Sequence, residues 1–145
     1  MPVFPSVEWF DAIKDLVNAD PAFRQLGTVD AVFGVKVGEK IYEITFEAFE
    51  CTGIRAASDA DLEKMDFWLE QPFDGWKDMI ENIKAHGAAD LSHTLNTLDL
   101  TLPQGLAQAH DGVRRDAFYR FNQSIQDFFD AAAKIDTQFA QPVSA

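Results

Sequence analysis

The sequence predicts one α+β domain, in which an antiparallel sheet of four to five strands is covered on one face by about five helices. The chain has 145 residues, the usual length of a single domain. Its apolar residues alternate along the middle of the chain and recur every three to four positions toward both ends. With 47% hydrophobic residues, it has the apolar content of a globular domain. We therefore expect one domain over residues 1–145, with a frayed tail over 141–145.

Two helices are expected at the start of the chain. Ser6 is a suitable N-cap for the first, because its hydroxyl can accept a hydrogen bond from a backbone N–H of the first turn. The apolar positions of that helix follow at helical spacing: Trp9, Ile13, Leu16 and Val17. Asp20 and Pro21 then predict a second, short helix that ends at Gly27.

Four short strands are expected next, in residues 28–37, 40–49, 51–57 and 65–70. Apolar and polar side chains alternate along the first, second and fourth. Gly38 and Glu39 predict a tight hairpin turn, and Gly53 indicates a bulge or a close backbone approach. A turn is expected at residues 59–61. Consecutive strands joined by turns predict an antiparallel meander.

The helical period returns in the second half of the chain. One predicted helix carries on one face Phe73, Trp76, Met79, Ile80 and Ile83. It ends near Gly87. Leucines at 91, 95 and 98 indicate another helix, but those at 98, 100 and 102 also alternate, so residues 98–102 are open to a fifth strand. The last predicted helix has an unbroken apolar stripe: Phe118, Phe121, Ile125, Phe128, Ala132 and Ile135.

The charge of the chain bears on its partners. Acidic residues outnumber basic ones 24 to 12, for a net charge of −12. This field repels phosphate backbones and anionic lipid headgroups, so we expect no nucleic-acid partner. No apolar run approaches the roughly 18 residues of a membrane span, and the N-terminus lacks the features of a signal peptide. We expect no integral membrane insertion and a cytoplasmic location.

Residues that bind metals or attack substrates are few and scattered. Cys51 is the one cysteine, so no disulfide within the chain can form, and its place after an apolar run is typical of a core residue. His86 and His93 lie seven residues apart near Asp90, which leaves too few convergent ligands for a metal site. We expect neither a metal nor a cofactor.

Two constellations resemble catalytic groups but have simpler structural explanations. Asp90, Ser92 and His93 are the residue types of a triad, but adjacent residues on a helix point in different directions, so we expect them not to meet. Glu43 and Glu47 share one face of a strand, opposite the apolar set. The solvated face of the sheet is the simpler interpretation of this pair.

Phosphate-binding and nucleophile motifs are also missing from the sequence. It contains no glycine-rich phosphate loop followed by Lys-Ser or Lys-Thr, and no Gly-x-Ser-x-Gly elbow. Arg114 and Arg115 begin the last helix, where ion pairs with Asp111 and Asp116 are a simpler expectation than contact with a ligand carboxylate. We therefore expect a protein that is not an enzyme.

Aromatic content is the most conspicuous remaining feature. The chain contains 13 phenylalanines and 3 tryptophans, many of them on the faces predicted to point inward. A well-packed core is the commoner meaning of such a pattern. A ligand pocket is also lined mainly by apolar and aromatic side chains, and periodicity alone does not separate the two.

Three segments of the chain resemble the sterol carrier protein type-two domain, in its small stand-alone bacterial members. The first is the opening helix with the run Asn18-Ala19-Asp20-Pro21-Ala22-Phe23. The second runs from Phe67-Trp68-Leu69 through Pro72-Phe73-Asp74-Gly75-Trp76-Lys77-Asp78-Met79-Ile80. The third is Arg114-Arg115-Asp116 with Phe118, Phe121 and the last helix. The likeness spans nearly the whole chain and rests on pattern rather than on an invariant motif.

This resemblance implies a twisted antiparallel sheet of about five strands, with an apolar tunnel between the sheet and its helices. It implies a non-catalytic module that binds and transfers or sequesters a fatty acid, an acyl chain or a sterol-like lipid. The chain departs from the family after the middle helix, where Gly87-Ala88-Ala89-Asp90-Leu91 and a leucine-rich segment replace the usual glycine-rich strand.

Twelve residues are the candidate walls of the apolar site: Phe33, Val35, Ile44, Phe46, Phe67, Leu69, Trp76, Ile80, Leu95, Phe121, Ile125 and Phe128. Two alternatives stay open. The amphipathic C-terminal helix has a face suited to a homodimer seam. A small-molecule enzyme with an apolar pocket would need an acid or base, for which Tyr42, Asp66 and His93 are the candidates.

Overall fold

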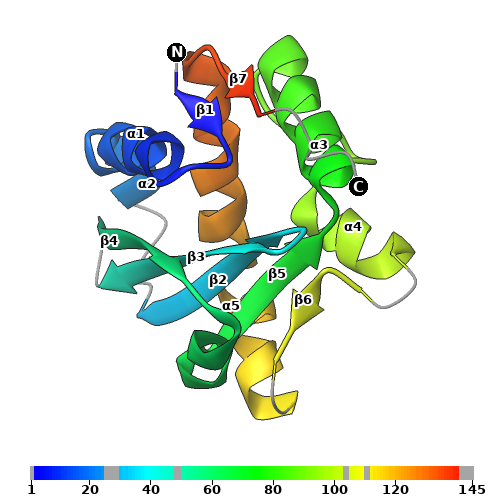
Figure 1. The fold of residues 1–145 in the computed structure, drawn as a ribbon. Helices are drawn as coiled ribbons and strands as arrows, with labels where there is room; N and C mark the ends of the chain where they lie inside the picture. Colours follow the sequence, from blue (N-terminus) through cyan, green and yellow to red (C-terminus); the bar gives the residue numbers. More distant parts are fainter. Residues whose placement is uncertain (1, 25–29, 48–49, 103–104, 110–111, 141–145) are drawn as a thin grey trace.

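Figure 1 shows a β-sheet with helices packed on one side, in a computed structural model that describes residues 2–24, 30–47, 50–102, 105–109 and 112–140. Among these residues the main sheet has five strands in the order β4-β3-β2-β5-β6. The α+β class predicted from the sequence is confirmed. Residues 141–145, where we expect a frayed tail, lie outside the described part.

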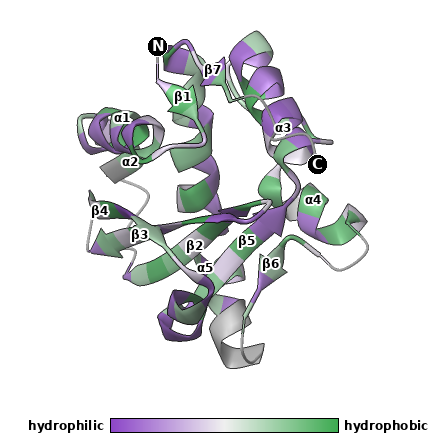
Figure 2. Cartoon of the chain, in the orientation of Figure 1, coloured by the Kyte–Doolittle hydropathy of each residue, from purple (hydrophilic) through white to green (hydrophobic). Residues whose placement is uncertain are grey.

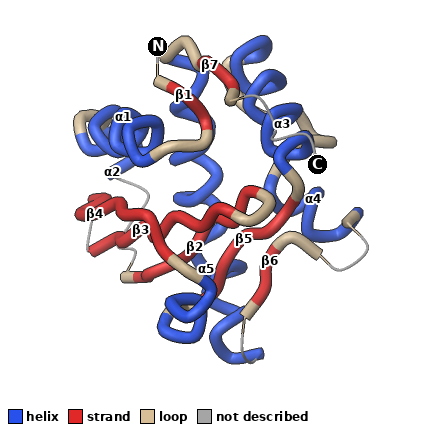
Figure 3. The backbone as a smooth tube through the Cα atoms, viewed as in Figure 1, coloured by secondary structure: helices blue, strands red, loops and turns tan. Residues whose placement is uncertain are grey.

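The elements follow the predicted order closely. The first half contains β1 (Val3–Phe4), α1 (Val7–Asn18), α2 (Pro21–Arg24), β2 (Ala31–Val37), β3 (Lys40–Glu47), β4 (Glu50–Ala57) and the 3-10 helix η1 (Asp59–Lys64). The second half contains β5 (Phe67–Gln71), α3 (Phe73–His86), α4 (Leu95–Thr101), β6 (Ala107–Gln108), α5 (Gly112–Asp130), the 3-10 helix η2 (Ala131–Lys134) and β7 (Gln138–Phe139). In Figure 3 the main strands gather below helices α1 and α3, and α5 passes behind them.

The local signals act as expected at most boundaries. The Ser6 hydroxyl accepts a hydrogen bond from Trp9 N at 3.0 Å, and Asp20 Oδ1 accepts one from Ala22 N at 2.9 Å. Gly38 turns the chain between β2 and β3 with φ 60°, a conformation that favours glycine. The register of β3 and β4 shifts between Thr45 and Phe46, so the bulge indicated by Gly53 is present. The expected helix end at Gly27 lies outside the described residues.

The sheet is mixed, which corrects the predicted antiparallel meander. β2, β3 and β4 are antiparallel neighbours, but β5 pairs with β2 and runs parallel to it. A parallel neighbour needs a connection that crosses the sheet. The chain makes this crossing from β4 to β5 through η1, where the sequence predicts only a turn. Alternation identifies a strand but not its neighbour, which explains the error.

The segment 98–102 is not a strand. Residues 95–101 form α4, and the strand that completes the sheet is the two-residue β6, which is antiparallel to β5. Alternating leucines are compatible with a helix here because Leu95 is buried, Leu98 is half-buried and Leu100 is exposed. The Thr94 side chain caps this helix by accepting a hydrogen bond from Thr97 N at 3.2 Å.

Helices α1, α3 and α5 cover one face of the sheet, and each is amphipathic (Figures 1 and 2). The stripe on α5 is used within this core, since Phe118, Ile125 and Phe128 are fully buried. The helical stripe does not extend unchanged to Ile135, because α5 passes into η2 at Ala131. Aromatic rings fill the layer between the sheet and α5.

A small second core covers the other face of the sheet. It contains Ile41, Leu62 and Met65, where Leu62 belongs to η1. Gly34 of β2 lies beneath it, and a Cβ atom on this glycine would come within 2.7 Å of Met65 Sδ. The crossing chain can therefore lie close to the sheet only because residue 34 has no side chain.

The two ends of the described chain are paired. β1 and β7 form a parallel two-stranded sheet, with hydrogen bonds from Gln138 N to Pro2 O and from Ala140 N to Phe4 O. Trp9 Nε1 also donates to Thr137 Oγ1 at 3.0 Å. Within the described ranges, no helix combines the length and the apolar character needed to cross a membrane.

Candidate functional site

A groove of about 510 Å³ lies at one end of the sheet, where β5 meets α3. Its walls come from β5 and the start of α3, from β6, from the end of α4 and from the β2–β3 turn. The residues that line it are Gly38, Trp68, Glu70, Gln71, Pro72, Leu102, Gly105 and Gln108. The volume lies within the usual range of about 300 to 1,000 Å³ for small-molecule sites.

A buried carboxylate holds the α4–β6 side of this groove. Asp99 of α4 is 6% exposed, and its Oδ1 accepts hydrogen bonds from Leu106 N and Ala107 N, both at 2.9 Å. Its Oδ2 accepts one from the Tyr119 hydroxyl of α5 at 2.8 Å. One side chain therefore connects α4, β6 and α5. Sequence reasoning missed Asp99, whose only signal is an acidic residue between two leucines.

On the outer wall of the groove, the Trp68 indole contacts a charged side chain, Glu70. Trp68 Nε1 donates to Glu70 Oε1 at 3.0 Å. Lys36 Nζ lies 3.9 Å from Glu70 Oε2 and 3.8 Å from Asp59 Oδ1, so one cation is shared between two carboxylates. Of these three charged side chains, two are carboxylates and one is a cation.

Gln71 is the most unusual residue of the groove. It is 4% exposed, and its Nε2 has no hydrogen-bond partner in the described part of the chain. A Cβ atom on Gly75 would lie 2.4 Å from Gln71 Oε1, so the amide occupies space that only a glycine in the first turn of α3 leaves open. Pro72, the N-cap of α3, offers no side-chain acceptor to this amide.

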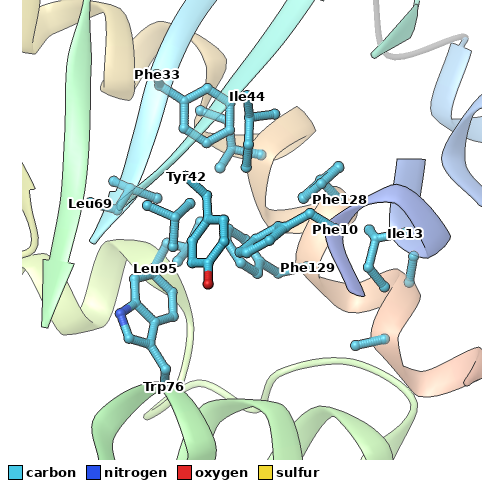
Figure 4. Close-up of a cluster of buried hydrophobic side chains, with 14 of the residues drawn as sticks. Phe10, Ile13, Phe33, Tyr42, Ile44, Leu69, Trp76, Leu95, Phe128 and Phe129 are labelled. Atoms are coloured by element: carbon cyan, nitrogen blue, oxygen red, sulfur yellow. The ribbon is translucent and has the colours of Figure 1, made fainter. Parts of the chain in front are cut away.

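The twelve residues predicted to wall an internal site lie elsewhere, in the main core. Eleven are at most 1% exposed, and Phe121 is half-buried against them. Phe46, Phe33 and Phe67 stack across the sheet with ring centroids 5.6 and 5.4 Å apart. Phe128 and Phe118 of α5 meet the ends of this stack edge-on. Figure 4 shows several of these side chains directed toward one another.

Rings thus occupy the layer in which the family resemblance places a tunnel. Two smaller hollows, of about 230 and 300 Å³, also lie outside this layer. Among the groove and these two hollows of the described chain, Ile80 is the one predicted wall residue that lines any of them, beside β7 and the outer side of α3. A ligand between the sheet and α5 would therefore have to displace stacked side chains.

The structure corrects the expectation that Asp90, Ser92 and His93 stay apart. They lie in a turn rather than on a helix, and Asp90 Oδ1 is 2.9 Å from Ser92 Oγ and 2.7 Å from His93 Nδ1. His93 Nε2 lies 2.9 Å from Asp78 Oδ2 of α3. The hydrogen bond with Asp90, followed by that with Asp78, raises the pKa of His93.

Ser92 Oγ lies 3.3 Å from His93 Nδ1, but both ring nitrogens lie closer to a carboxylate than to this hydroxyl. A catalytic histidine must take the serine proton on a free ring nitrogen. Both nitrogens of His93 lie against carboxylates, which favour the protonated ring. Hydrogen bonds from His93 and Asn82 in turn lower the pKa of Asp90. The cluster joins α3 to the chain before α4 through Asn82 and Asp78.

The remaining histidines are His86 and His110. His86 is exposed, and its Nδ1 lies 2.9 Å from Asn82 O. His110 lies outside the described residues. In the described ranges, no three side chains among histidine, cysteine, aspartate and glutamate are placed to hold a metal ion.

Two of the other candidates, Cys51 and Glu43, have structural partners. Cys51 is 2% exposed, and burial raises the pKa of its thiol to about 12, so it is a core residue as predicted. Glu43 forms two hydrogen bonds with Arg55, at 3.0 and 2.7 Å, on the outer face of the sheet. Glu47 is exposed. The side chains of Arg114 and Arg115 lie outside the described part of the structure.

The three candidate acids or bases are not placed in a common site. Tyr42 is buried in the main core beside Phe10, where burial raises its pKa. Asp66 Oδ2 accepts a hydrogen bond from Val32 N at 2.9 Å. His93 is bound to Asp78 and Asp90. Each has a separate local environment.

Comparison with known proteins adds no relative: no protein-family model, no curated protein and no solved structure matches this chain. The fold and the groove therefore define its class. It is an α+β protein with a single-sided helical layer, a ring-filled core and an open groove at the end of its sheet.

Proposed function

We propose that this protein is a non-catalytic carrier that binds a small, largely apolar molecule in the groove at the end of β5. The observation that carries the proposal is the groove itself, with about 510 Å³ of space between the apolar side chains of Trp68, Pro72 and Leu102. Burial of apolar ligand surface would supply the affinity. Transfer or sequestration of the ligand in the cytoplasm is the proposed role.

The polar chemistry of the described residues supports binding over catalysis. In the turn where Ser92, His93 and Asp90 meet, both ring nitrogens of His93 lie against carboxylates. The one cysteine is buried, and the pKa of its thiol is raised. The resemblance to the sterol carrier protein type-two domain favours the same class of function. The proposed binding site differs in position from the tunnel that the resemblance implies, because side chains fill the layer between the sheet and the helices.

Titration with a neutral fluorescent apolar probe, N-phenyl-1-naphthylamine, tests the proposal. We expect saturable binding by the wild-type protein and a rise in melting temperature, because a ligand that binds only the folded state stabilises it. The Gln108→Trp substitution places a large side chain in the groove on edge strand β6. We expect it to weaken probe binding by about tenfold or more.

The matched control is Thr52→Trp, which places the same side chain on the opposite edge strand, β4. Thr52 is exposed and lies outside the groove. We expect its affinity for the probe to stay close to that of the wild-type protein. Equal affinities for wild-type protein and Gln108→Trp would place the ligand elsewhere and reject the groove.

A homodimer built on the C-terminal helix is not favoured as a second function. Phe118, Ile125 and Phe128 of the proposed seam are buried within a single chain. They are therefore unavailable to a partner unless α5 leaves its own sheet.

A further inference from the structure

The Gln71 amide is the feature of the groove that packing alone does not explain. Gln71 is the last residue of β5, is 4% exposed, and has a buried Nε2 without a partner in the described part of the chain. Buried polar groups in folded proteins are nearly always paired, so an exception calls for a reason. A hydrogen bond from this amide to an acceptor atom of a ligand is one such reason.

The surroundings show that this amide is accommodated by its neighbours. Gly75 leaves the space against which the Gln71 side chain packs, since a Cβ there would approach Gln71 Oε1 to 2.4 Å and Cδ to 3.0 Å. The backbone of Gln71 is also held, because Gly38 N donates to Gln71 O at 3.4 Å. The last side-chain torsion of glutamine is soft, so the amide can turn its N–H groups toward the groove.

The charges of the described side chains beside the groove favour one kind of acceptor. Glu70 lines the groove, and Lys36, its nearby cation, is shared with Asp59. The chain as a whole carries −12. A ligand carboxylate would be repelled by Glu70 and by this overall field. An uncharged carbonyl oxygen accepts the same hydrogen bond without that repulsion.

We infer that the groove binds an apolar molecule through an uncharged carbonyl group, such as an ester, amide or ketone, whose oxygen accepts a hydrogen bond from Gln71 Nε2. The inference rests on the proposed function and adds the ligand chemistry. Trp68, Pro72 and Leu102 contact the apolar part, and Gln71 selects the carbonyl over an ether or a carboxylate.

Displacement of N-phenyl-1-naphthylamine by three matched ligands tests this selection. Methyl decanoate carries the carbonyl, decyl methyl ether lacks it, and decanoic acid is charged at neutral pH. For the wild-type protein we expect the ester to bind about fivefold to tenfold tighter than the ether, as for one added hydrogen bond to a buried donor. We expect the acid to bind more weakly than the ester.

The decisive variant is Gln71→Met, which keeps the length of the side chain and removes the amide. We expect the ester and the ether to bind it equally. We also expect an unfolding midpoint in urea at or above that of the wild-type protein, because an unpaired buried donor has been removed. Gln123→Met is the control, since Gln123 is exposed, lies outside the groove and donates through Nε2 to Asp127 Oδ1, and it should keep the preference for the ester.

The outcomes separate the two proposals. An unchanged preference for the ester in Gln71→Met, or no preference in the wild-type protein, would overturn the role of Gln71 while leaving the groove as a binding site. Tighter binding of the acid than of the ester would overturn the choice of an uncharged ligand. Binding of none of the four compounds by the wild-type protein would reject the proposed function and this inference together.

Discussion

At the residue scale, several polar side chains organise this fold by taking the place of missing backbone partners. The Asn18 amide both donates to Cys51 O and accepts from Cys51 N, at 2.8 and 2.9 Å, as a neighbouring strand would. Asp66 accepts a hydrogen bond from Val32 N in the same manner. Backbone groups that would otherwise be buried without partners are thereby satisfied.

His93 contributes a pH dependence that can be measured. The folded state raises its pKa above the ordinary value of 6.5, through hydrogen bonds with Asp90 and then Asp78. Its contribution to the free energy of unfolding is therefore complete below that value and is lost as the pH rises through the raised pKa. Between about pH 6 and pH 9, we expect the urea midpoint of the wild-type protein to fall more than that of His93→Gln.

His86→Gln is the matched control for this measurement, because His86 is exposed and lies next to the main-chain oxygen of Asn82 rather than a carboxylate. It should show the same fall as the wild-type protein. Asp90 does not change its charge in this pH range, because its pKa lies below the ordinary 3.8. Parallel curves for the wild-type protein and His93→Gln would show that the contact with the two carboxylates is not maintained in solution.

At the element scale, the shortest strand of the main sheet, β6, lines the groove. β6 contains only Ala107 and Gln108. It is held by its pairing with β5, by the hydrogen bond from Glu70 N to Leu106 O at 2.9 Å, and by the Asp99 carboxylate. A strand this short depends on such side-chain contacts for its position.

Replacing Asp99 by alanine should release β6. The change leaves the Leu106 and Ala107 amides without their carboxylate acceptor, in surroundings that exclude water. We expect a loss of about 3 kcal/mol in the free energy of unfolding. We also expect faster hydrogen exchange at these two amides and weaker binding of ligands in the groove.

Asp99→Asn keeps the size of the side chain and removes its negative charge. Its Oδ1 can still accept from both amides, so we expect a loss smaller than that of the alanine variant and slow exchange at 106 and 107. Fast exchange at these amides in the wild-type protein would contradict the assignment of Asp99 as the anchor of β6.

At the scale of the whole molecule, nearly all the large apolar side chains of the described residues are buried or half-buried within a single chain. Those that remain exposed are Val3, Leu91, Leu100 and Tyr119. Val3 lies on β1, far along the chain from the leucines around α4. The stripe of α5, which the sequence also allowed as a dimer seam, packs on its own sheet.

We therefore expect the protein to be a monomer. Sedimentation velocity over a hundredfold range of concentration, up to roughly 100 µM, should give one constant sedimentation coefficient. A coefficient that rises with concentration would indicate association. Leu100→Glu, on the exposed side of α4, would then test whether the exposed leucines form the contact.

The groove and the paired ends of the chain are likewise products of the whole molecule. Residues from β2, β5, α3, α4 and β6 meet at the groove, although they span positions 38 to 108. β1 and β7 meet although they stand at opposite ends of the sequence. The local sequence around each of these segments does not indicate which other segment it contacts.

The class of fold, most element boundaries and most of the core could be predicted from the sequence alone. These depend on local spacing: Ser6 caps a helix, Gly38 turns a hairpin, and the stripe from Phe118 to Phe128 faces inward. Periodicity reports which side of an element is buried, and it does so correctly whatever the element packs against.

Only the tertiary structure decided which segments of the chain contact one another. The parallel pairing of β5 with β2, the helix in place of a strand at 98–102, and the meeting of Asp90 with Ser92 and His93 all depend on contacts between segments. The same holds for the filling of the aromatic layer and for the groove at Gln71. Spacing along a chain specifies which residues are apolar, whereas the position of an empty space depends on how separate elements pack together.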